Sequence, residues 1–336
     1  MARTSPEWID PASLARFVQA TTSCTRSRHN RDLRAPCRVH DPYNGDRPIL
    51  DRSRTTTRYA EPVTQHPGGT GPRTRPRTRL RRRLSWEIAI VLALSYGASA
   101  VYAIVAIIER ITRETALASQ TATINRPLAD RAVFDLVYQL LAFAFGLAPV
   151  ALVIYLLWQR RRPYLWRLGL ARPAGASPGW WLRETGGGFA LAAAIGIPGL
   201  AFYLFARTIG INANVVPTAL DAFWWTVPVL VLSALRAALG EELIVVAYLF
   251  DRLRRIGLGS WAIITASALL RGSYHLYQGF GGFIGNAVMG LVFGWAYVRW
   301  GRALPLIVAH WVLDIVSFVG YPIALALWPA LFTVGS

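Results

Sequence analysis

Residues 88–108 read IAIVLALSYGASAVYAIVAII, a stretch without a charged side chain. A helix needs about 20 apolar residues, at about 1.5 Å each, to cross the roughly 30 Å of hydrocarbon in a bilayer. This stretch therefore predicts a membrane-spanning helix. The composition agrees, because 54% of residues are hydrophobic and only 16% are charged, against about 25% charged in an average soluble domain.

Further apolar runs follow the first. We expect spans at 133–158, 186–206, 223–250, 261–277, 283–298, 303–319 and 321–334, of which the last two could form one broken helix. The predicted fold is an all-α, polytopic membrane helix bundle of about eight transmembrane helices over residues 84–334. We expect this multi-pass protein in the cell membrane.

Residues 1–83 differ from the rest of the chain. They are rich in Arg, Pro, Thr and Ser without helical or strand periodicity, so we expect a disordered, basic tail. The arginine run at 73–83 is interpreted as a topology signal, with anionic headgroups or nucleic acid as the alternatives, and no nucleic-acid partner is expected. Because Cys24 and Cys37 both lie in the tail, no disulfide framework or cysteine metal site is indicated for the membrane part.

Arginines between the spans predict the orientation, because short loops rich in basic residues stay in the cytoplasm. With the N-terminus inside, the cytoplasmic segments 73–83, 159–185, 251–260 and 299–302 hold 18 arginines, and the opposite segments hold 5. We therefore expect a cytoplasmic N-terminus.

A few ionisable residues interrupt the predicted spans. A charge at the bilayer centre costs at least about 2.5–3.5 kcal/mol, so such residues are candidates for function. They are Arg236, Glu241 and Glu242 in the fourth span, Arg271 and His275 in the fifth, and His310 and Asp314 in the seventh. Each also has a structural interpretation, since an intramembrane histidine can simply join helices by a hydrogen bond and an acidic pair can anchor a helix end.

The spacing of these residues favours a chemical role. His310 and Asp314 lie four residues apart on one helical face, where the carboxylate can accept a proton from one imidazole nitrogen and leave the other free. Arg271 and His275 repeat this spacing.

Glu241 and Glu242 point about 100° apart on a helix, so one can face a cavity while the other secures the helix. A carboxylate in an apolar cavity can act near neutral pH as a general base on water.

Three elements within residues 230–320 resemble the intramembrane proteases related to the CAAX prenyl endopeptidase, the CPBP or Abi family. They are Gly240-Glu241-Glu242 followed by Tyr248 to Leu253, the stretch from Ser267 to Tyr274-His275, and Pro305 to His310 with Asp314 four residues on. The resemblance implies an eight-helix endopeptidase that cleaves membrane-bound or lipidated peptides. It does not choose among prenylated CAAX tails, bacteriocin precursors and membrane-bound signalling factors.

Carried over by position, the resemblance implies that Glu241 activates the attacking water and that Glu242 supports it. His275, His310 and Asp314 would position this water and stabilise the oxyanion. Amide hydrolysis needs such a base and such donors, and each oxyanion donor contributes about 2.7–4 kcal/mol.

The chain departs from the family pattern at two positions. The family normally has Arg four residues after the second glutamate, where this chain has Val246, and Phe four residues before the first histidine, where this chain has Arg271. We therefore expect Arg271 to supply the missing cation from the neighbouring helix. Arg236 is a poorer candidate, because its separation rotates it about 140° and 120° away from the two glutamates.

Depth in the membrane is a difficulty for a shared site. From the cytoplasmic ends of their predicted spans, Glu241 lies about 14 Å deep, His310 about 10 Å and His275 about 21 Å. A shared site therefore requires tilt, a later helix start or a break, for which Gly272 is one available position.

Alternatives to a metal-free protease stay open. Histidines and carboxylates could hold zinc with one position open for water, although no His-Glu-x-x-His helix is present. A protein that kept the fold without the chemistry would be a catalytically inactive scaffold or chaperone. A proton relay through the buried acids would instead make a proton-coupled transporter.

Overall fold

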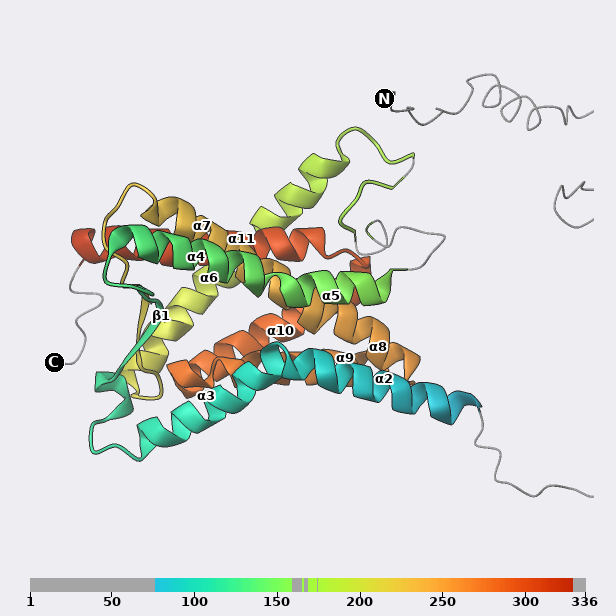
Figure 1. The fold of residues 1–336 in the computed structure, drawn as a ribbon, viewed down its shortest axis with the longest axis horizontal. Helices are drawn as coiled ribbons and strands as arrows, with labels where there is room; N and C mark the ends of the chain where they lie inside the picture. Colours follow the sequence, from blue (N-terminus) through green and yellow to red (C-terminus); the bar gives the residue numbers. More distant parts are fainter. Residues whose placement is uncertain (1–75, 159–164, 166–168, 174, 329–336) are drawn as a thin grey trace, which may run out of the picture. The chain divides into compact units, whose positions relative to one another are not determined.

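The computed structural model describes residues 76–158, 165, 169–173 and 175–328 (Figure 1). Most of these residues are helical, as expected for an all-α membrane fold. The predicted tail lies outside the described residues up to position 75, but its last part is helical, because helix α2 spans Pro76–Ala93. Arginine has good helix propensity, and Leu84, Ile88 and Val91 bury one face of this helix.

The first predicted span is a bent pair of helices rather than one straight helix. After α2 comes α3, Tyr96–Ile111, at an angle of 56°. Ser95 Oγ donates a hydrogen bond to the Val91 carbonyl at 2.7 Å, a bond to the preceding turn that often bends helices. Gly97 permits the close approach, since a Cβ there would lie 2.7 Å from the Leu92 carbonyl oxygen.

Two short strands that the sequence did not predict flank the second and third spans. One precedes the second span, and the other follows the third. Helices α4 (Ala132–Gly146) and α5 (Ala148–Leu157) form the second span, and α6 (Trp180–Thr208) forms the third. Before α4, a 3₁₀ turn η1 (Leu117–Ser119) leads into strand β1 (Thr121–Asn125), which pairs in parallel with β2 (Asn214–Thr218) after α6. The strand pair ties together two connections at one end of the bundle.

The remaining spans form one long helix and a set of helices packed around it. The long helix consists of α7 (Thr226–Gly240), the π-helical segment η3 (Glu241–Tyr248) and α8 (Leu249–Arg255). It is followed by α9 (Ser260–Tyr274), the 3₁₀ turn η4 (Leu276–Gln278), α10 (Phe280–Trp300) and α11 (Leu304–Leu327). Helix α9 packs against α3 and α10, and α11 packs against α6 and α7 (Figure 1).

The seventh and eighth predicted spans are one helix, because α11 continues through Pro322 to Leu327. Among the described residues, four helices are long and apolar enough to cross a membrane, or five if α2 and α3 form one span. Helix α9 is about 22 Å long, shorter than the roughly 30 Å hydrocarbon core. The predicted count of eight therefore stays a prediction. Large apolar side chains such as Trp224 and Tyr102 point outward, as lipid-facing residues would.

The described parts of the four arginine-rich segments lie at one end of the bundle. Contacts between Gly257 and Arg81, between Arg252 and the Leu156 carbonyl, and between Gly169 and Arg302 join them. Both β strands and the turn η4 lie toward the other end, where Asn212 pairs with Gly279.

Candidate active site

Two adjacent glutamates open the π-helical segment in the middle of the α7–α8 helix. Both are buried, with Glu241 5% exposed and Glu242 fully enclosed at 0%. π-helical turns are rare and are frequent at functional sites. The apolar residues that follow carry no sequence signal for this distortion, so sequence reasoning missed it.

Glu242 joins three helices. Its Oε1 accepts hydrogen bonds from Arg271 on α9 at 2.5 Å and from Nδ1 of His310 on α11 at 2.9 Å. An ionised carboxylate only accepts hydrogen bonds, so Nδ1 of His310 carries the proton in this arrangement. Arg271 is itself fully buried, and a buried cation needs such a partner.

Position 246 belongs to the apolar core. Val246 is 1% exposed and lies in a cluster with Phe250, Ile263 and Phe293. The guanidinium carbon of Arg271 lies 5.3 Å from the centre of the Phe293 ring. The structure thus places the cation on α9, where the sequence led us to expect it, and an aliphatic side chain at the position where the family has arginine.

Glu241 faces a different set of groups. Its Oε2 accepts a hydrogen bond from the Tyr274 hydroxyl at 2.7 Å and lies 3.7 Å from Nε of Arg271. Its Oε1 lies 3.9 Å from Nε2 of His275. Neither of these last two atoms hydrogen-bonds to any residue that the structure describes, and Nε2 is buried. Two groups with unused hydrogen-bonding capacity therefore face each other.

The sequence led us to expect a hydrogen bond between His310 and Asp314, and the structure does not contain it. Nε2 of His310 lies 3.6 Å from Oδ2 of Asp314, which is too long for a hydrogen bond. The carboxylate that bonds the ring is Glu242. The Asp314 and His275 side chains are 22% and 19% exposed, so they mark the more open side of the site.

His275 reaches the level of Glu241 without any break in α9. The preceding helix continues to Arg255, beyond its predicted end, so Glu241 lies about 21 Å of helix from that end. The span Ser260–Tyr274 measures about the same, and His275 follows directly. Gly272 stays helical. The depth difficulty came from ending the fourth span too early.

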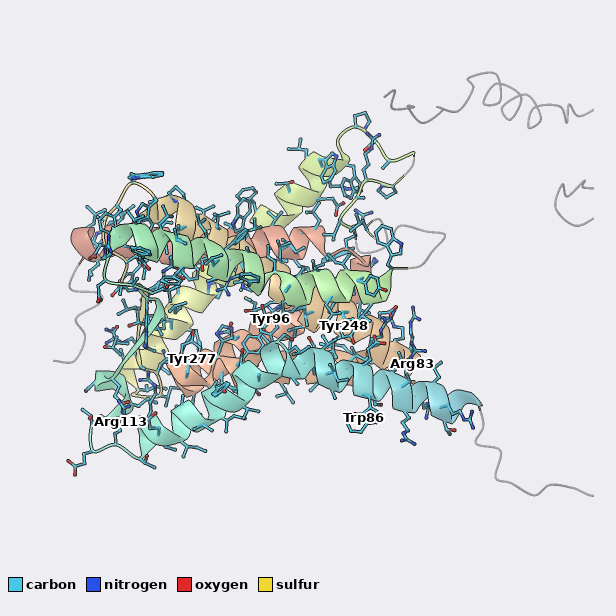
Figure 2. All side chains as sticks on the ribbon, in the orientation of Figure 1. Arg83, Trp86, Tyr96, Arg113, Tyr248 and Tyr277 are labelled. Atoms are coloured by element: carbon cyan, nitrogen blue, oxygen red, sulfur yellow. The ribbon has the colours of Figure 1, made fainter. Side chains whose placement is uncertain are left out.

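Two tyrosines belong to the site although the sequence analysis did not assign them to it. Tyr274 bonds Glu241, and its ring lies 4.9 Å from that of Tyr96. Tyr96 begins α3 at the bend (Figure 2) and lies against Gly240, where a Cβ would come 2.2 Å from the tyrosine hydroxyl. The sequence did contain a signal for each of them. Tyr274 directly precedes the candidate His275, and Tyr96 is a polar side chain inside an apolar span.

The imidazole and carboxylate groups of this site are also of the types that bind zinc. Across the described part of the chain, no group of three or more His, Cys, Asp or Glu side chains is arranged to hold a metal ion. One nitrogen of His310 is already used by Glu242. Any zinc would therefore have to rearrange these side chains.

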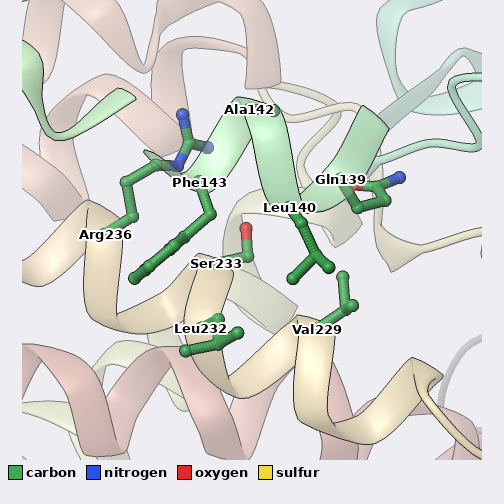
Figure 3. Close-up of a pocket in the computed structure, with 8 residues that line it drawn as sticks. All are labelled: Gln139, Leu140, Ala142, Phe143, Val229, Leu232, Ser233 and Arg236. Carbon is green, nitrogen blue, oxygen red and sulfur yellow. The ribbon is translucent and has the colours of Figure 1, made fainter. Parts of the chain in front are cut away.

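A small cleft lies between α4 and α7 (Figure 3). It is lined by Gln139, Leu140, Ala142, Phe143, Val229, Leu232, Ser233 and Arg236. Of these residues only Arg236 is charged, and it stands five positions before Glu241 on the same helix.

Comparison with known families supports the resemblance over part of the chain. The family described as type II CAAX prenyl endopeptidase Rce1-like matches residues 223–316. These residues are therefore similar to a CAAX-protease-type domain. The matched segment runs from just before α7 into α11 and includes Glu241, Glu242, Arg271, His275, His310 and Asp314. No curated protein and no solved structure matches the chain.

Proposed function

We propose that the protein is an intramembrane endopeptidase in which Glu241 activates water. The observation that carries the proposal is the pair formed by Oε1 of Glu241 and Nε2 of His275, 3.9 Å apart and both free of hydrogen bonds to described residues. A water beside this pair, at about 2.8 Å from each atom, would satisfy both. It would lie within proton-transfer distance of the carboxylate.

The proposed reaction uses this water as nucleophile. Glu241 takes a proton from the water as its oxygen attacks the carbonyl carbon of the peptide bond. The carbonyl oxygen becomes an oxyanion, which needs hydrogen-bond donors in place before the reaction. When the C–N bond breaks, Glu241 returns the proton to the departing amine, so the carboxylate is regenerated.

The other residues have supporting roles in this proposal. His275 orients the water, and His310, together with Asp314 on the more open side of the site, positions the substrate carbonyl and its oxyanion. Glu242 and Arg271 hold His310 and the three helices in place through the bonds described above. Tyr274 fixes the carboxylate of Glu241, so that Oε1 is the oxygen left for the water.

The family match supports a substrate that resides in the membrane, because CAAX proteases act on membrane-associated prenylated substrates. We propose a membrane-bound or lipidated peptide. We also propose that the arginine-rich end faces the cytoplasm, since it holds most of the loop arginines, and that the protein resides in the cell membrane.

We propose a mechanism without metal. Activity should survive incubation with a chelator such as 1,10-phenanthroline, at a concentration that removes zinc from a control metalloprotease. Loss of activity that returns on addition of zinc would reverse this part of the proposal.

The experiment that tests the function uses purified protein in lipid nanodiscs and a library of membrane peptides. Wild type should cleave some of them, and Glu241→Gln should cleave none or very few. A scaffold or transporter of this fold would cleave none in either form, and equal cleavage by both forms would show that Glu241 is not the base.

A further inference from the structure

Arg236 is a charged residue inside the long α7–α8 helix that the proposed chemistry does not use. Its side chain is partly buried, yet no hydrogen bond or ion pair to a residue within the described ranges holds the guanidinium. The two buried arginines among the described residues behave differently, since Arg252 pairs with Glu87 at 2.6 Å and Arg271 with Glu242 at 2.5 Å. An unpaired cation within a span is costly and therefore points to a function.

Arg236 is one of the eight residues that line the cleft between α4 and α7 (Figure 3). Gly146, at the end of α4, leaves the room, because a Cβ there would lie 2.5 Å from Cδ of Arg236 and 3.0 Å from one terminal nitrogen. No acidic residue lines the cleft. The nearby carboxylate of Asp135 on α4 is occupied, since its Oδ1 accepts hydrogen bonds from the Leu128 amide and from Gln139.

The cleft and the candidate base share one helix. Arg236 precedes Glu241 by five residues, which is about 7.5 Å along the helix axis and about 140° around it. Tyr96 lies against Gly240, which stands between the two in the sequence of this helix. An extended peptide rises about 3.3–3.6 Å per residue, so about two residues of substrate would span this axial distance.

We propose that Arg236 binds a carboxylate of the peptide substrate in this cleft. The guanidinium offers a fork of N–H donors that matches a carboxylate in two parallel hydrogen bonds. An apolar membrane peptide can bring a carboxylate from two sources, its C-terminus or an acidic side chain. The inference rests on the proposed endopeptidase function and adds a determinant of where the peptide is cut.

The test uses one palmitoylated apolar peptide that wild type cleaves, in three forms. They carry a free C-terminal carboxylate, a C-terminal amide, or an amide together with one aspartate in the sequence. Wild type should prefer at least one carboxylate form over the plain amide by about tenfold or more in kcat/KM, mostly through KM. The preferred form identifies the source of the carboxylate.

Arg236→Gln should remove this preference by weakening the carboxylate form alone, and Arg236→Lys should keep part of it. A structural role for Arg236 would instead slow all three forms equally. Equal slowing of the three, or a wild type that treats them alike, would overturn the inference.

Binding separates this inference from the proposed function. The same three peptides are titrated onto wild type, Glu241→Gln and Arg236→Gln in nanodiscs of zwitterionic lipid, so that no anionic headgroup competes. Suppose that binding is selective for the carboxylate peptides and depends on Arg236, but that no peptide is cleaved. This result would contradict the protease proposal and would still support the subsite. If all three peptides bound equally well, or if none bound, the subsite would be contradicted. Cleavage by wild type would still support the protease proposal separately.

Discussion

At the scale of single residues, Glu241 and Glu242 have identical side chains in different surroundings. Glu242 is enclosed, and Arg271 and His310 both donate to one of its oxygens. Glu241 has one oxygen bonded to Tyr274 and the other directed toward His275. The first arrangement suits an anchor and the second suits a base.

Tyr274→Phe should lower kcat while leaving KM nearly unchanged. The substitution removes the hydrogen bond that fixes Oε2 of Glu241, and a hydrogen bond to a charged group contributes about 1.5–3 kcal/mol, so a loss of about 10- to 100-fold is expected. Steady-state kinetics on a cleaved library peptide provides the measurement.

Tyr248→Phe is the matched control for this change. Its hydroxyl also donates to a carboxylate, that of Glu87 at 3.2 Å, but away from the candidate site. The control should keep its kcat. Equal losses in the two variants would show that Tyr274 matters only for folding.

Glu242 and Arg271 should be strongly coupled in stability. Arg271→Met leaves a buried carboxylate without its cation, which costs about 3–5 kcal/mol. The double variant Glu242→Gln with Arg271→Met should cost less than the sum of the single changes, by at least about 1 kcal/mol. Thermal unfolding in nanodiscs measures the cycle, and additive losses would mean that the pair does not act as a unit.

Part of this site was predictable from residues alone. Charged side chains in apolar runs stand out because the bilayer makes them costly, and i,i+4 spacing placed His310 and Asp314 on one face. The partner of a buried group depends on which helices pack together, and that information lies outside any one span. For this reason the bond from His310 to Glu242, and the one from Tyr274 to Glu241, were not predicted.

At the scale of elements, the bend between α2 and α3 brings a tyrosine to the helix that carries the glutamates. Tyr96 begins α3 and presses its hydroxyl onto Gly240, the last residue of α7. The close contact requires a residue without Cβ at this position. The bend thus couples the first span to the start of the π-helical segment.

Gly240→Ala should destabilise the protein, although alanine is usually the better helix former. Its Cβ would lie 2.2 Å from the Tyr96 hydroxyl, and overpacking of this kind costs about 1–3 kcal/mol. Adding Tyr96→Phe should recover much of the loss by removing the oxygen. Melting temperatures of wild type and of these two variants test this contact.

Gly187→Ala on α6 is the control, because a Cβ there meets nothing within 4 Å. It should gain up to about 0.5–1 kcal/mol from better helix propensity. If Gly240→Ala behaved like this control, the close packing of Tyr96 on α7 would be contradicted.

Element boundaries show what hydropathy can and cannot predict. Apolar runs located most of the helices. Hydropathy does not show the bend within the run 88–108, because the bend is associated with a local hydrogen bond of Ser95 and not with a break in the apolar run. The end of the fourth helix was placed at Phe250, since arginines follow, although these remain helical to Arg255. That difference made the predicted depth of Glu241 too small relative to His275.

At the scale of the whole molecule, the bundle has an arginine-rich end and a strand-bearing end. Positive loops favour the cytoplasmic side, so the two ends should be accessible from opposite sides of the membrane. In a background with Cys24→Ser and Cys37→Ser, cysteine is introduced at Glu114, on the strand-bearing end, or at Arg254, on the other. Both positions are exposed.

A membrane-impermeant maleimide applied to intact cells should label Glu114→Cys directly and Arg254→Cys only after permeabilisation. The opposite pattern would invert the proposed orientation.

The most direct test of the central claim is the rate of peptide cleavage by Glu241→Gln relative to wild type, in nanodiscs and at matched folded fraction. Glutamine keeps the size of the side chain but cannot take a proton from water, and general base catalysis contributes about 10²- to 10⁴-fold. We predict a loss in kcat within or beyond that range with little change in melting temperature. Cleavage by Glu241→Gln at the wild-type rate would contradict the claim.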